Sequence, residues 1–421
     1  MAMAYHHNAN GMSMLSGAWR DRLVDRAARA LDETAESVRL RIFAIARRGS
    51  GGQGRGLFPP TSRRRSAMFD LPDPPWLRNA WYVAGWSTDV GRSLQATRIL
   101  DEAILLYRRE DGSPVALEDA CPHRKLPLSA GRLVGDSVEC GYHGLTFDGS
   151  GSCVRAPTQE DSVPPSAVVH SYPVVDRWNL LWIWMGDPAK ADPDEIYRIE
   201  NFDNPAWGRT DGGAMDIACN YLWVVDNLLD PSHVAWVHVT SFAGAGTEGT
   251  PLRIDTLDDG VLVWRWIPDK PVPPYYADLV KFEGPCDRKQ HYECQFPSIA
   301  INKSIFAPVG RGAPEAEASS GPLPAGTFIN ISYNFLTPVD AETTRYYWFQ
   351  HRNTDPDDKA ISARMLAGAE AAFREDRDIL VQVQQGMANK RSRNINLGLD
   401  AGAMRFRKLL EKRIAAEQAA G

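Results

Sequence analysis

The stretch "CPHRKLPLSAGRLVGDSVECGYHG" (121–144) contains two cysteines and two histidines in a regular arrangement. Cys121 and His123 come first, and Cys140 and His143 follow after sixteen residues, which gives the pattern C-x-H-x16-C-x2-H. Proline or glycine follows each cysteine, and both residue types are typical of tight loops. Two loops that each carry one thiol and one imidazole can hold a metal centre from both sides.

Two kinds of metal centre accept this ligand set. A structural zinc ion also takes two cysteines and two histidines, but zinc fingers usually draw each pair from a single element. In a Rieske-type two-iron, two-sulfide centre, both thiolates bind one iron and both imidazoles bind the other. One cysteine and one histidine on each loop suit the second arrangement. We therefore predict that Cys121, His123, Cys140 and His143 bind a Rieske [2Fe–2S] cluster that relays single electrons.

The sequence around this motif is built from short strand-like runs separated by turn residues, such as "AWYVAGW" (80–86) and "LLWIWMG" (180–186). The Pro- and Asp-rich segment 186–196 resembles a domain boundary. Beyond it, strand-like and helical runs alternate, which indicates an α+β fold. We expect an antiparallel β Rieske domain over 69–188. A catalytic α+β domain with a helix-covered antiparallel sheet should follow over 189–421. The strand-like runs there are 260–267, 326–338 and 343–352, and the helical ones are 220–238, 358–386 and 401–419.

The first 68 residues differ in composition from the rest of the chain. They carry 12 Lys/Arg and only 5 Asp/Glu. Apolar residues at helical spacing over 19–48 predict an amphipathic helix, and "GSGGQGRG" (49–56) predicts a flexible linker. We interpret residues 1–68 as a dispensable N-terminal extension, or as the result of a start codon placed too early. A helix that binds a membrane surface or a partner is the alternative.

The whole chain has 421 residues, a net charge of −6, 43% hydrophobic and 24% charged residues. The negative charge gives no reason to expect nucleic acid binding, and no run approaches the roughly 18 apolar residues of a membrane span. Six cysteines in a chain of this length do not predict a disulfide scaffold. We expect a cytoplasmic protein.

A second cluster of potential ligands lies in "DNLLDPSHVAWVH" (226–238). His233 and His238 are five residues apart, and five residues of regular helix turn about 500°, which leaves the two side chains on different faces. Pro231 should break the helix, because it lacks a backbone donor and clashes with the preceding turn. His238 would then lie at or just past a helix end. Such irregularity could bring both imidazoles onto one metal ion.

A metal ion held by two histidines and one carboxylate keeps positions open for O2, as in non-haem Fe(II) oxygenases. The helical run "AAFREDRDILVQVQQ" (371–385) offers three acidic candidates for the carboxylate, Glu375, Asp376 and Asp378. An oxygen-activating iron also gives the relay cluster a destination for its electrons. We therefore predict a mononuclear non-haem Fe(II) site that uses O2.

Together the two motifs resemble the oxygenase (α) subunit of Rieske non-haem iron oxygenases, in the group of vanillate O-demethylase and dicamba monooxygenase. The resemblance extends over residues 76–415. It implies that Asp376 is the carboxylate ligand beside His233 and His238. It also implies that Asp230 bridges His233 to His143 of the partner subunit in a head-to-tail homotrimer, and that Asn227 lies near the iron.

The same resemblance implies a terminal oxygenase that receives electrons from NAD(P)H through a flavin and iron–sulfur reductase, with or without a ferredoxin. The substrate would be a small aromatic compound, and the favoured reactions are O-demethylation of a methoxylated aromatic acid with release of formaldehyde, or ring monohydroxylation. A cis-dihydroxylating dioxygenase or an N-demethylase is the alternative enzyme. An electron-transfer protein is the alternative of another class, which the second cluster disfavours.

The expected substrate-binding strands are 296–308 and 326–338, where Asn302 and Asn334 interrupt apolar runs and could orient a substrate. Relatives that bind methoxybenzoates often carry a histidine at the place of Asn334 and, in the dicamba enzyme, a tryptophan at the place of Ala367. Both departures argue against copying a substrate from those relatives.

Overall fold

The computed structural model describes residues 72–420 except 161, 240, 241, 243, 245, 248 and 312–323. These residues belong to a compact unit that spans Arg63–Gly421. The amphipathic helix, linker and basic run expected within 1–68 lie outside the described residues.

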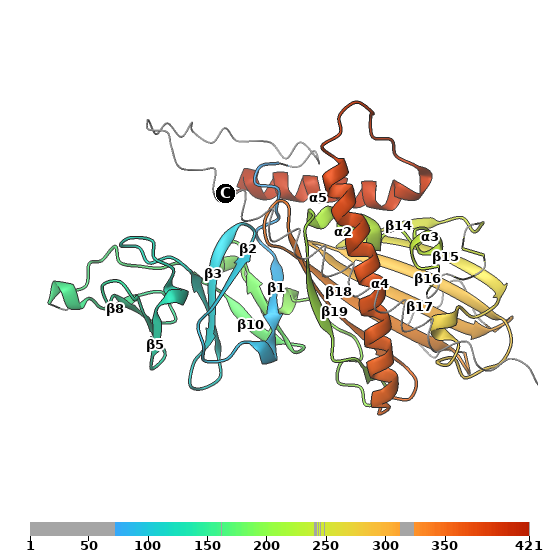
Figure 1. The fold of residues 1–421 in the computed structure, drawn as a ribbon, viewed down its shortest axis with the longest axis horizontal. Helices are drawn as coiled ribbons and strands as arrows, with labels where there is room; N and C mark the ends of the chain where they lie inside the picture. The colour runs from blue at the N-terminus through green and yellow to red at the C-terminus, as the bar shows by residue number, and fades with distance from the viewer. Residues whose placement is uncertain are drawn as a thin grey trace, which may run out of the picture. The chain divides into compact units, whose positions relative to one another are not determined.

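The first half of the described chain, the predicted Rieske domain, consists of three small antiparallel sheets (Figure 1). The first is three-stranded, in the order β1-β11-β10, and the other two are four-stranded, in the orders β2-β3-β4-β9 and β5-β6-β7-β8. The loop with Cys121 and His123 lies between β4 and β5, and the loop with Cys140 and His143 lies between β6 and β7. The strands are β1 (Trp81–Trp86), β2 (Gln95–Ile99), β3 (Glu102–Arg108), β4 (Pro114–Glu118), β5 (Arg132–Val134), β6 (Ser137–Glu139), β7 (Thr146–Phe147), β8 (Cys153–Arg155), β9 (Ser171–Tyr172), β10 (Val174–Arg177) and β11 (Leu180–Trp184).

The second half of the chain forms one eight-stranded antiparallel sheet. Seven strands follow the order β12-β19-β18-β17-β16-β15-β14, and β13 also pairs with β19. The long central strands make a rigid floor for the site described below. The strands are β12 (Gly208–Arg209), β13 (Gly213–Ile217), β14 (Arg253–Leu257), β15 (Gly260–Lys270), β16 (Cys286–Gln295), β17 (Ile299–Pro308), β18 (Phe328–Pro338) and β19 (Thr344–Arg352).

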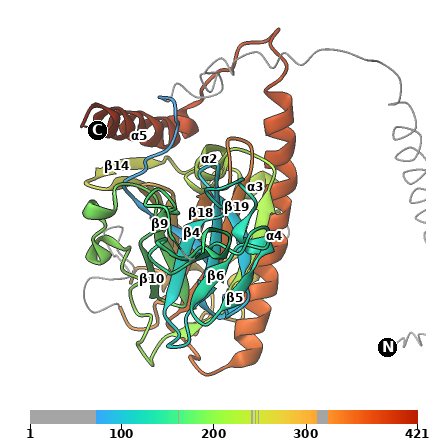
Figure 2. The same cartoon turned by 90° about the vertical axis from the view of Figure 1, so that its left-hand side faces the viewer.

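Helices cover one face of this sheet, and the 28-residue helix α4 is prominent in both views (Figures 1 and 2). They are α2 (Tyr221–Leu228), α3 (Val234–Val237), α4 (Lys359–Gly386) and α5 (Ala401–Ala420). The buried residues of α4 recur every three or four positions, which places them on one face. Asp358 caps this helix, since its carboxylate accepts a hydrogen bond from the Ile361 amide at 3.0 Å. Among the described residues, no helix is both long and apolar enough to cross a lipid bilayer.

The two faces of the sheet bury different partners. Ile329, Ile331 and Tyr333 of β18 pack with Trp81 and Trp182 of the Rieske domain in one apolar cluster. The side chains between them point to the helix-covered face, because successive residues of a strand alternate in direction. A single central strand therefore contributes to the contact between the two halves and to the opposite, helix-covered face.

The predicted fold class is confirmed, and the strand-like and helical runs named above coincide with strands and helices of the structure. Strand β16 escaped prediction, because its sequence "CDRKQHYECQ" is largely charged or polar although most of it is buried. A central strand can be buried on both faces and still have a polar sequence, because its polar side chains can line internal cavities. The division between domains at 188/189 stays a prediction; a short 3₁₀ helix, Pro188–Lys190, lies there.

Candidate metal centres

The two loops of the Cys/His motif have the same backbone hydrogen bonds. The Cys121 amide donates to the Leu126 carbonyl at 2.9 Å, and the Cys140 amide donates to the Leu145 carbonyl at 2.8 Å. Four residues after each cysteine the backbone is left-handed, with φ of 59° at Lys125 and 75° at Gly144. The repeated turn explains how loops of different sequence present their ligands in the same way.

The cysteines of this motif are buried and the histidines lie nearer to solvent. Cys121 and Cys140 are each 2% exposed, whereas His123 is exposed. The rings of His123 and His143 lie 4.6 Å apart, so the histidines pair on one side and the cysteines on the other. Nδ1 of His143 is buried without a hydrogen-bond partner, as expected for an atom that binds a metal. This arrangement fits a Rieske cluster with its imidazole side accessible to an electron donor or acceptor.

Burial raises the pKa of the Cys121 thiol, and its hydrogen bond with Cys140 acts in the same direction, against the lowering effect of the His123 amide. A thiol that keeps its proton is a poor metal ligand until a metal displaces that proton.

The second site begins at a break between two helices. Helix α2 ends at Leu228, Pro231 follows, and the short helix α3 begins at Val234. His233 is the N-terminal cap of α3 and His238 its C-terminal cap, with φ −102° and ψ 43°. The rings lie 5.3 Å apart. The expected break and the position of His238 just past a helix end are confirmed, which explains the five-residue spacing.

Helical phase decides which acidic residue of α4 faces the histidines. The Asp376 side chain is 7% exposed, whereas those of Glu375 and Asp378 are 47% and 64% exposed. Ala369 and Ala372 precede Asp376 on the same buried face. Because these side chains are small, the helix lies close to the cavity and the Asp376 carboxylate reaches it.

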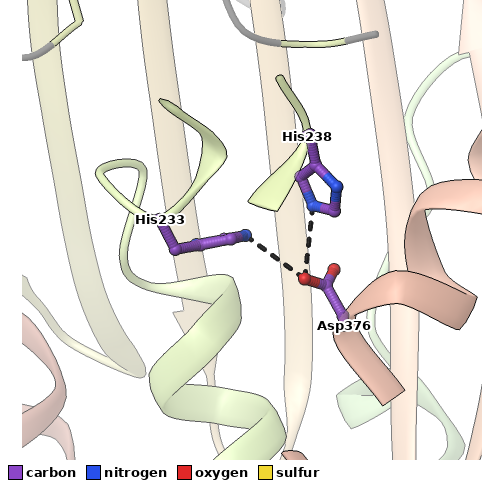
Figure 3. Close-up of side chains that lie close together, drawn as sticks. All are labelled: His233, His238 and Asp376. Atoms are coloured by element: carbon purple, nitrogen blue, oxygen red, sulfur yellow. Dashed lines mark ion pairs between the residues drawn. The ribbon is translucent and has the colours of Figure 1, made fainter. Parts of the chain in front are cut away.

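The three residues converge on one point (Figure 3). Nε2 of His233 lies 3.5 Å and Nε2 of His238 lies 3.2 Å from Oδ1 of Asp376. One ligand atom from each residue lies within 4.8 Å of the other two. Two imidazoles and one carboxylate from separate elements match the facial set of a non-haem Fe(II) site, and the remaining side opens to a cavity.

Hydrogen bonds from outside the triad fix the orientation of both rings. Nδ1 of His233 contacts the backbone oxygen of Asp230, and Nδ1 of His238 lies 2.7 Å from Oε2 of Glu375. Each ring therefore turns its Nε2 toward Asp376. Asn227 donates to Oδ1 of Asp376 at 3.2 Å, which places its amide beside the carboxylate.

The carboxylate of Asp230 lies differently from the family-based expectation. Its oxygens accept the backbone N–H groups of Ser232 at 2.7 Å and His233 at 3.2 Å, as a cap on the turn before α3. The ring of His233 contacts the backbone oxygen of Asp230 and not its carboxylate.

Burial lowers the pKa of His238, but the hydrogen bonds and charges of Asp376 and Glu375 outweigh this effect and raise the pKa.

A cavity adjoins the three ligands and lies between the sheet and the helices. Asn302 borders it and donates to the Leu228 carbonyl at 3.1 Å. Asn334 is 1% exposed and does not line it: its amide donates to the Asn302 side chain and accepts from the Tyr346 hydroxyl. Besides the triad, the lining consists of Leu228, Val234, Phe242, Tyr276, Tyr292, Asn302, Ser304, Asn330, Ser332, Gln350, Ala369, Ala372 and Phe373.

The sequence interpretation missed Ser304, Ser332 and Gln350, and it treated Glu375 only as a potential ligand. The alternation of polar and apolar residues in 299–308 and 328–338 was the available signal for the two serines. No periodic signal distinguishes Glu375 from any exposed helix carboxylate. Its role depends on how closely His238 approaches α4.

A Cys2His2 loop pair in a small β domain, with a two-histidine, one-carboxylate site in the following α+β domain, defines a Rieske-type oxygenase. The family models agree. The Rieske [2Fe-2S] domain matches residues 80–173, and the C-terminal domain of the vanillate O-demethylase oxygenase matches residues 217–416. The chain belongs to the Rieske non-haem iron oxygenases, as an oxidoreductase whose cofactors are a Rieske [2Fe–2S] cluster and a mononuclear non-haem iron.

Similar proteins are oxygenase components of multicomponent systems. The iron–sulfur subunit of the toluene-4-sulfonate monooxygenase system of Comamonas testosteroni is 39% identical over 81% of this chain and 98% of that protein. The dicamba O-demethylase oxygenase component of Stenotrophomonas maltophilia is 32% identical over 80% and 97%. A crystal structure of dicamba monooxygenase with 3,6-dichlorosalicylic acid matches with a TM-score of 0.74 at 31% identity, over 81% of this chain and 98% of that one.

Proposed function

We propose that the chain is the terminal oxygenase for a small aromatic acid and that its favoured reaction is O-demethylation. The observation that carries the proposal is the convergence of His233, His238 and Asp376 beside a partly apolar cavity. Relatives described as vanillate and dicamba O-demethylases support the reaction class. Per turnover, a methoxyarene, O2, two electrons and two protons would give a phenol, formaldehyde and water.

In this proposal Cys121, His123, Cys140 and His143 hold the cluster, while His233, His238 and Asp376 hold the iron. When bound, the two centres supply single-electron transfer and the activation of O2. The protein orients the ligands through Glu375 and Asn227 and limits water through Leu228 and Phe373. Asn302 faces the substrate, and Asn334 acts through Asn302, because all its polar atoms are already bonded within the protein.

We further propose a homotrimer in which Asp230 approaches His143 of the partner subunit. Asp230 would then carry electrons from the partner's Rieske cluster to the mononuclear iron site. The surfaces on both sides support it. Tyr142, next to His143, is 62% exposed, and Trp236, in the short helix α3 that follows Asp230, is 77% exposed. Large exposed aromatic side chains are typical of protein interfaces. The electrons would come from NAD(P)H through a flavin and iron–sulfur reductase, with or without a ferredoxin, in the reducing cytoplasm.

The second candidate is monooxygenation of an aromatic sulfonate, which the 39% identity to a toluene-4-sulfonate monooxygenase subunit favours. Both candidates use the same ligands and the same electrons, so the shape and chemistry of the cavity decide between them. An assay for formaldehyde separates them: incubation with a reductase, NADH and methoxybenzoates releases formaldehyde only from the demethylase. A hydroxylated product from toluene-4-sulfonate, without formaldehyde, would establish the second reaction.

Asp376→Ala tests the iron site. We expect the variant to lose mononuclear iron and activity while it keeps the visible spectrum of the Rieske cluster. Retained oxidation of any substrate by this variant would exclude the assigned triad. Deleting residues 1–67 tests the dispensable extension and should leave both spectrum and activity unchanged.

A further inference from the structure

Strand β16 carries a buried arginine on the face of the sheet that holds the iron site. Arg288 and Tyr292 lie on the same face because they are four residues apart on one strand. Tyr292 lines the cavity. Arg288 is opposite Phe306 of β17 and Ile267 of β15, which places it farther along the sheet from the iron ligands.

Two of the three guanidinium nitrogens of Arg288 lack a hydrogen-bond partner in the part of the chain that the structure describes. The residue is 2% exposed, and its Nε and Nη2 atoms are buried without a hydrogen-bond acceptor. In the described part of the chain it forms no ion pair, unlike Arg345 or Arg407, which contact Asp216 and Asp226. A buried cation without a counter-ion is costly for the folded state. Such a group is kept when a ligand supplies the missing charge.

The surroundings of Arg288 connect it to the cavity. Its charge acts on the phenols of Tyr276 and Tyr292, and both tyrosines line the cavity. The Tyr276 hydroxyl donates to Ser304 Oγ at 3.0 Å, farther inside. A Cβ on Gly244 would lie 2.8 Å from Nη1 of Arg288, so the absence of a side chain at position 244 leaves room for the guanidinium.

Apart from the metal ligands, no side chain of the described cavity lining is charged. Along the strand, Arg288 and Tyr292 are about 13 Å apart at the backbone. Arg288 is not itself a lining residue, but its charge interacts with the lining residues Tyr276 and Tyr292. A benzene ring with substituents at opposite ends could place one substituent beside the triad and direct the other toward these tyrosines and Arg288. Arg352 also lies on this face, opposite Asn330, but it already donates to Ser362 and to the backbone oxygens of Asp355 and Asp358. Arg288 forms no ion pair among the described residues, so its charge is the one left for a ligand.

We propose that Arg288 binds the anionic group of the substrate, a sulfonate or carboxylate on the aromatic ring, at the end of the cavity away from the metal site. This proposal rests on the proposed oxidation of an aromatic acid and names the residue that selects the acid. The planar guanidinium presents paired donors that match two oxygens of either anion. Asn302, close to the triad, would contact the uncharged end of the substrate.

The test compares anionic and neutral ligands of the same shape. Wild-type holoenzyme and Arg288→Met are titrated with toluene-4-sulfonate, 4-methoxybenzoate and the neutral toluene-4-sulfonamide, and the melting temperature is recorded. We expect both anions, but not the sulfonamide, to raise the melting temperature of the wild type. Arg288→Met should bind the anions about 10- to 150-fold more weakly, the usual effect of losing a charged hydrogen bond, with sulfonamide binding unchanged.

Stability separates this role from a structural one. Without ligand, Arg288→Met should melt at or above the wild-type temperature, because an unpaired buried charge is removed. The control Arg352→Met should melt lower, since Arg352 donates to Ser362 and to the backbone oxygens of Asp355 and Asp358. If Arg288→Met is too unstable to titrate, the proposal is overturned unless Arg288→Lys, which keeps the charge but not the paired donors, folds and shows intermediate anion affinity.

Unchanged anion affinity in Arg288→Met overturns the proposal, and so does a wild type that binds the sulfonamide as well as the sulfonate. Preference for one anion over the other identifies the acid. These binding measurements do not depend on turnover. An inactive wild type that still binds anions through Arg288 would therefore refute the proposed reaction and leave this inference standing.

Discussion

Glu375→Ala is expected to weaken iron binding although Glu375 is not an iron ligand. The Glu375 carboxylate lies 2.7 Å from Nδ1 of His238 and holds the ring so that Nε2 faces Asp376. Loss of such an outer hydrogen bond typically costs 10- to 100-fold in metal affinity. Because the Glu375 side chain is 47% exposed, water can replace part of the interaction, and we expect about 10-fold, or about 1.4 kcal/mol.

The assay is an anaerobic Fe(II) titration against a chelator of known affinity, with the absorbance of the Rieske cluster as the internal measure of intact protein. Glu375→Gln keeps an oxygen acceptor for the Nδ1 proton and should retain most of the affinity. Glu370→Ala is the matched control, because Glu370 lies on the same helix and pairs only with Arg374 among the described residues. Wild-type affinity in Glu375→Ala would refute the orienting role, and equal losses in the Ala and Gln variants would show that charge, not orientation, matters.

Three further predictions concern the turn at Gly144, the buried hydroxyl of Thr337 and the cluster ligand Cys140. Gly144→Ala should lower the temperature at which the cluster absorbance is lost, because φ is 75° there and a Cβ would lie 3.0 Å from Pro157; an unchanged temperature would contradict the strained turn. Thr337→Val should reduce the free energy of unfolding by about 1–3 kcal/mol, since its buried hydroxyl donates to the Val83 carbonyl at 2.7 Å; calorimetry against Thr343→Val, a partly exposed control, measures the loss. Cys140→Ser should abolish the cluster spectrum while Fe(II) still binds at Asp376, and loss of both metals together would indicate that the two centres do not fold independently.

The ligand residues could be predicted from the sequence because metal chemistry restricts which residue types serve. Cys121 and His143 stand out by type and spacing alone. The break at Pro231 also follows from the sequence, since proline cannot continue the helix. Asp376 needed either the family resemblance or the helical phase of α4, because acidic neighbours stand on both sides of it.

The cavity wall was less predictable, because its polar residues sit in strands whose other face is apolar. Asn334 attracts attention in the sequence, yet the structure shows it bonded on all sides. Arg288 attracts none, because a charged residue in "CDRKQHYECQ" suggests an exposed surface. Only the pairing of β16 between β15 and β17 reveals that this strand is central and that its arginine is buried.

Successive side chains of β18 point to opposite faces of the sheet, and this alternation affects how such an enzyme can evolve. Ile329, Ile331 and Tyr333 hold the two halves together, whereas Asn330 and Ser332 face the cavity. Substitutions at the even positions can reshape what the cavity accepts while the contact on the other face stays intact. An insertion of one residue would exchange the two sets and spoil both. Strand β18 should thus tolerate substitution of its residues but not a change of length. Point mutations alone could therefore change which substrates the cavity accepts.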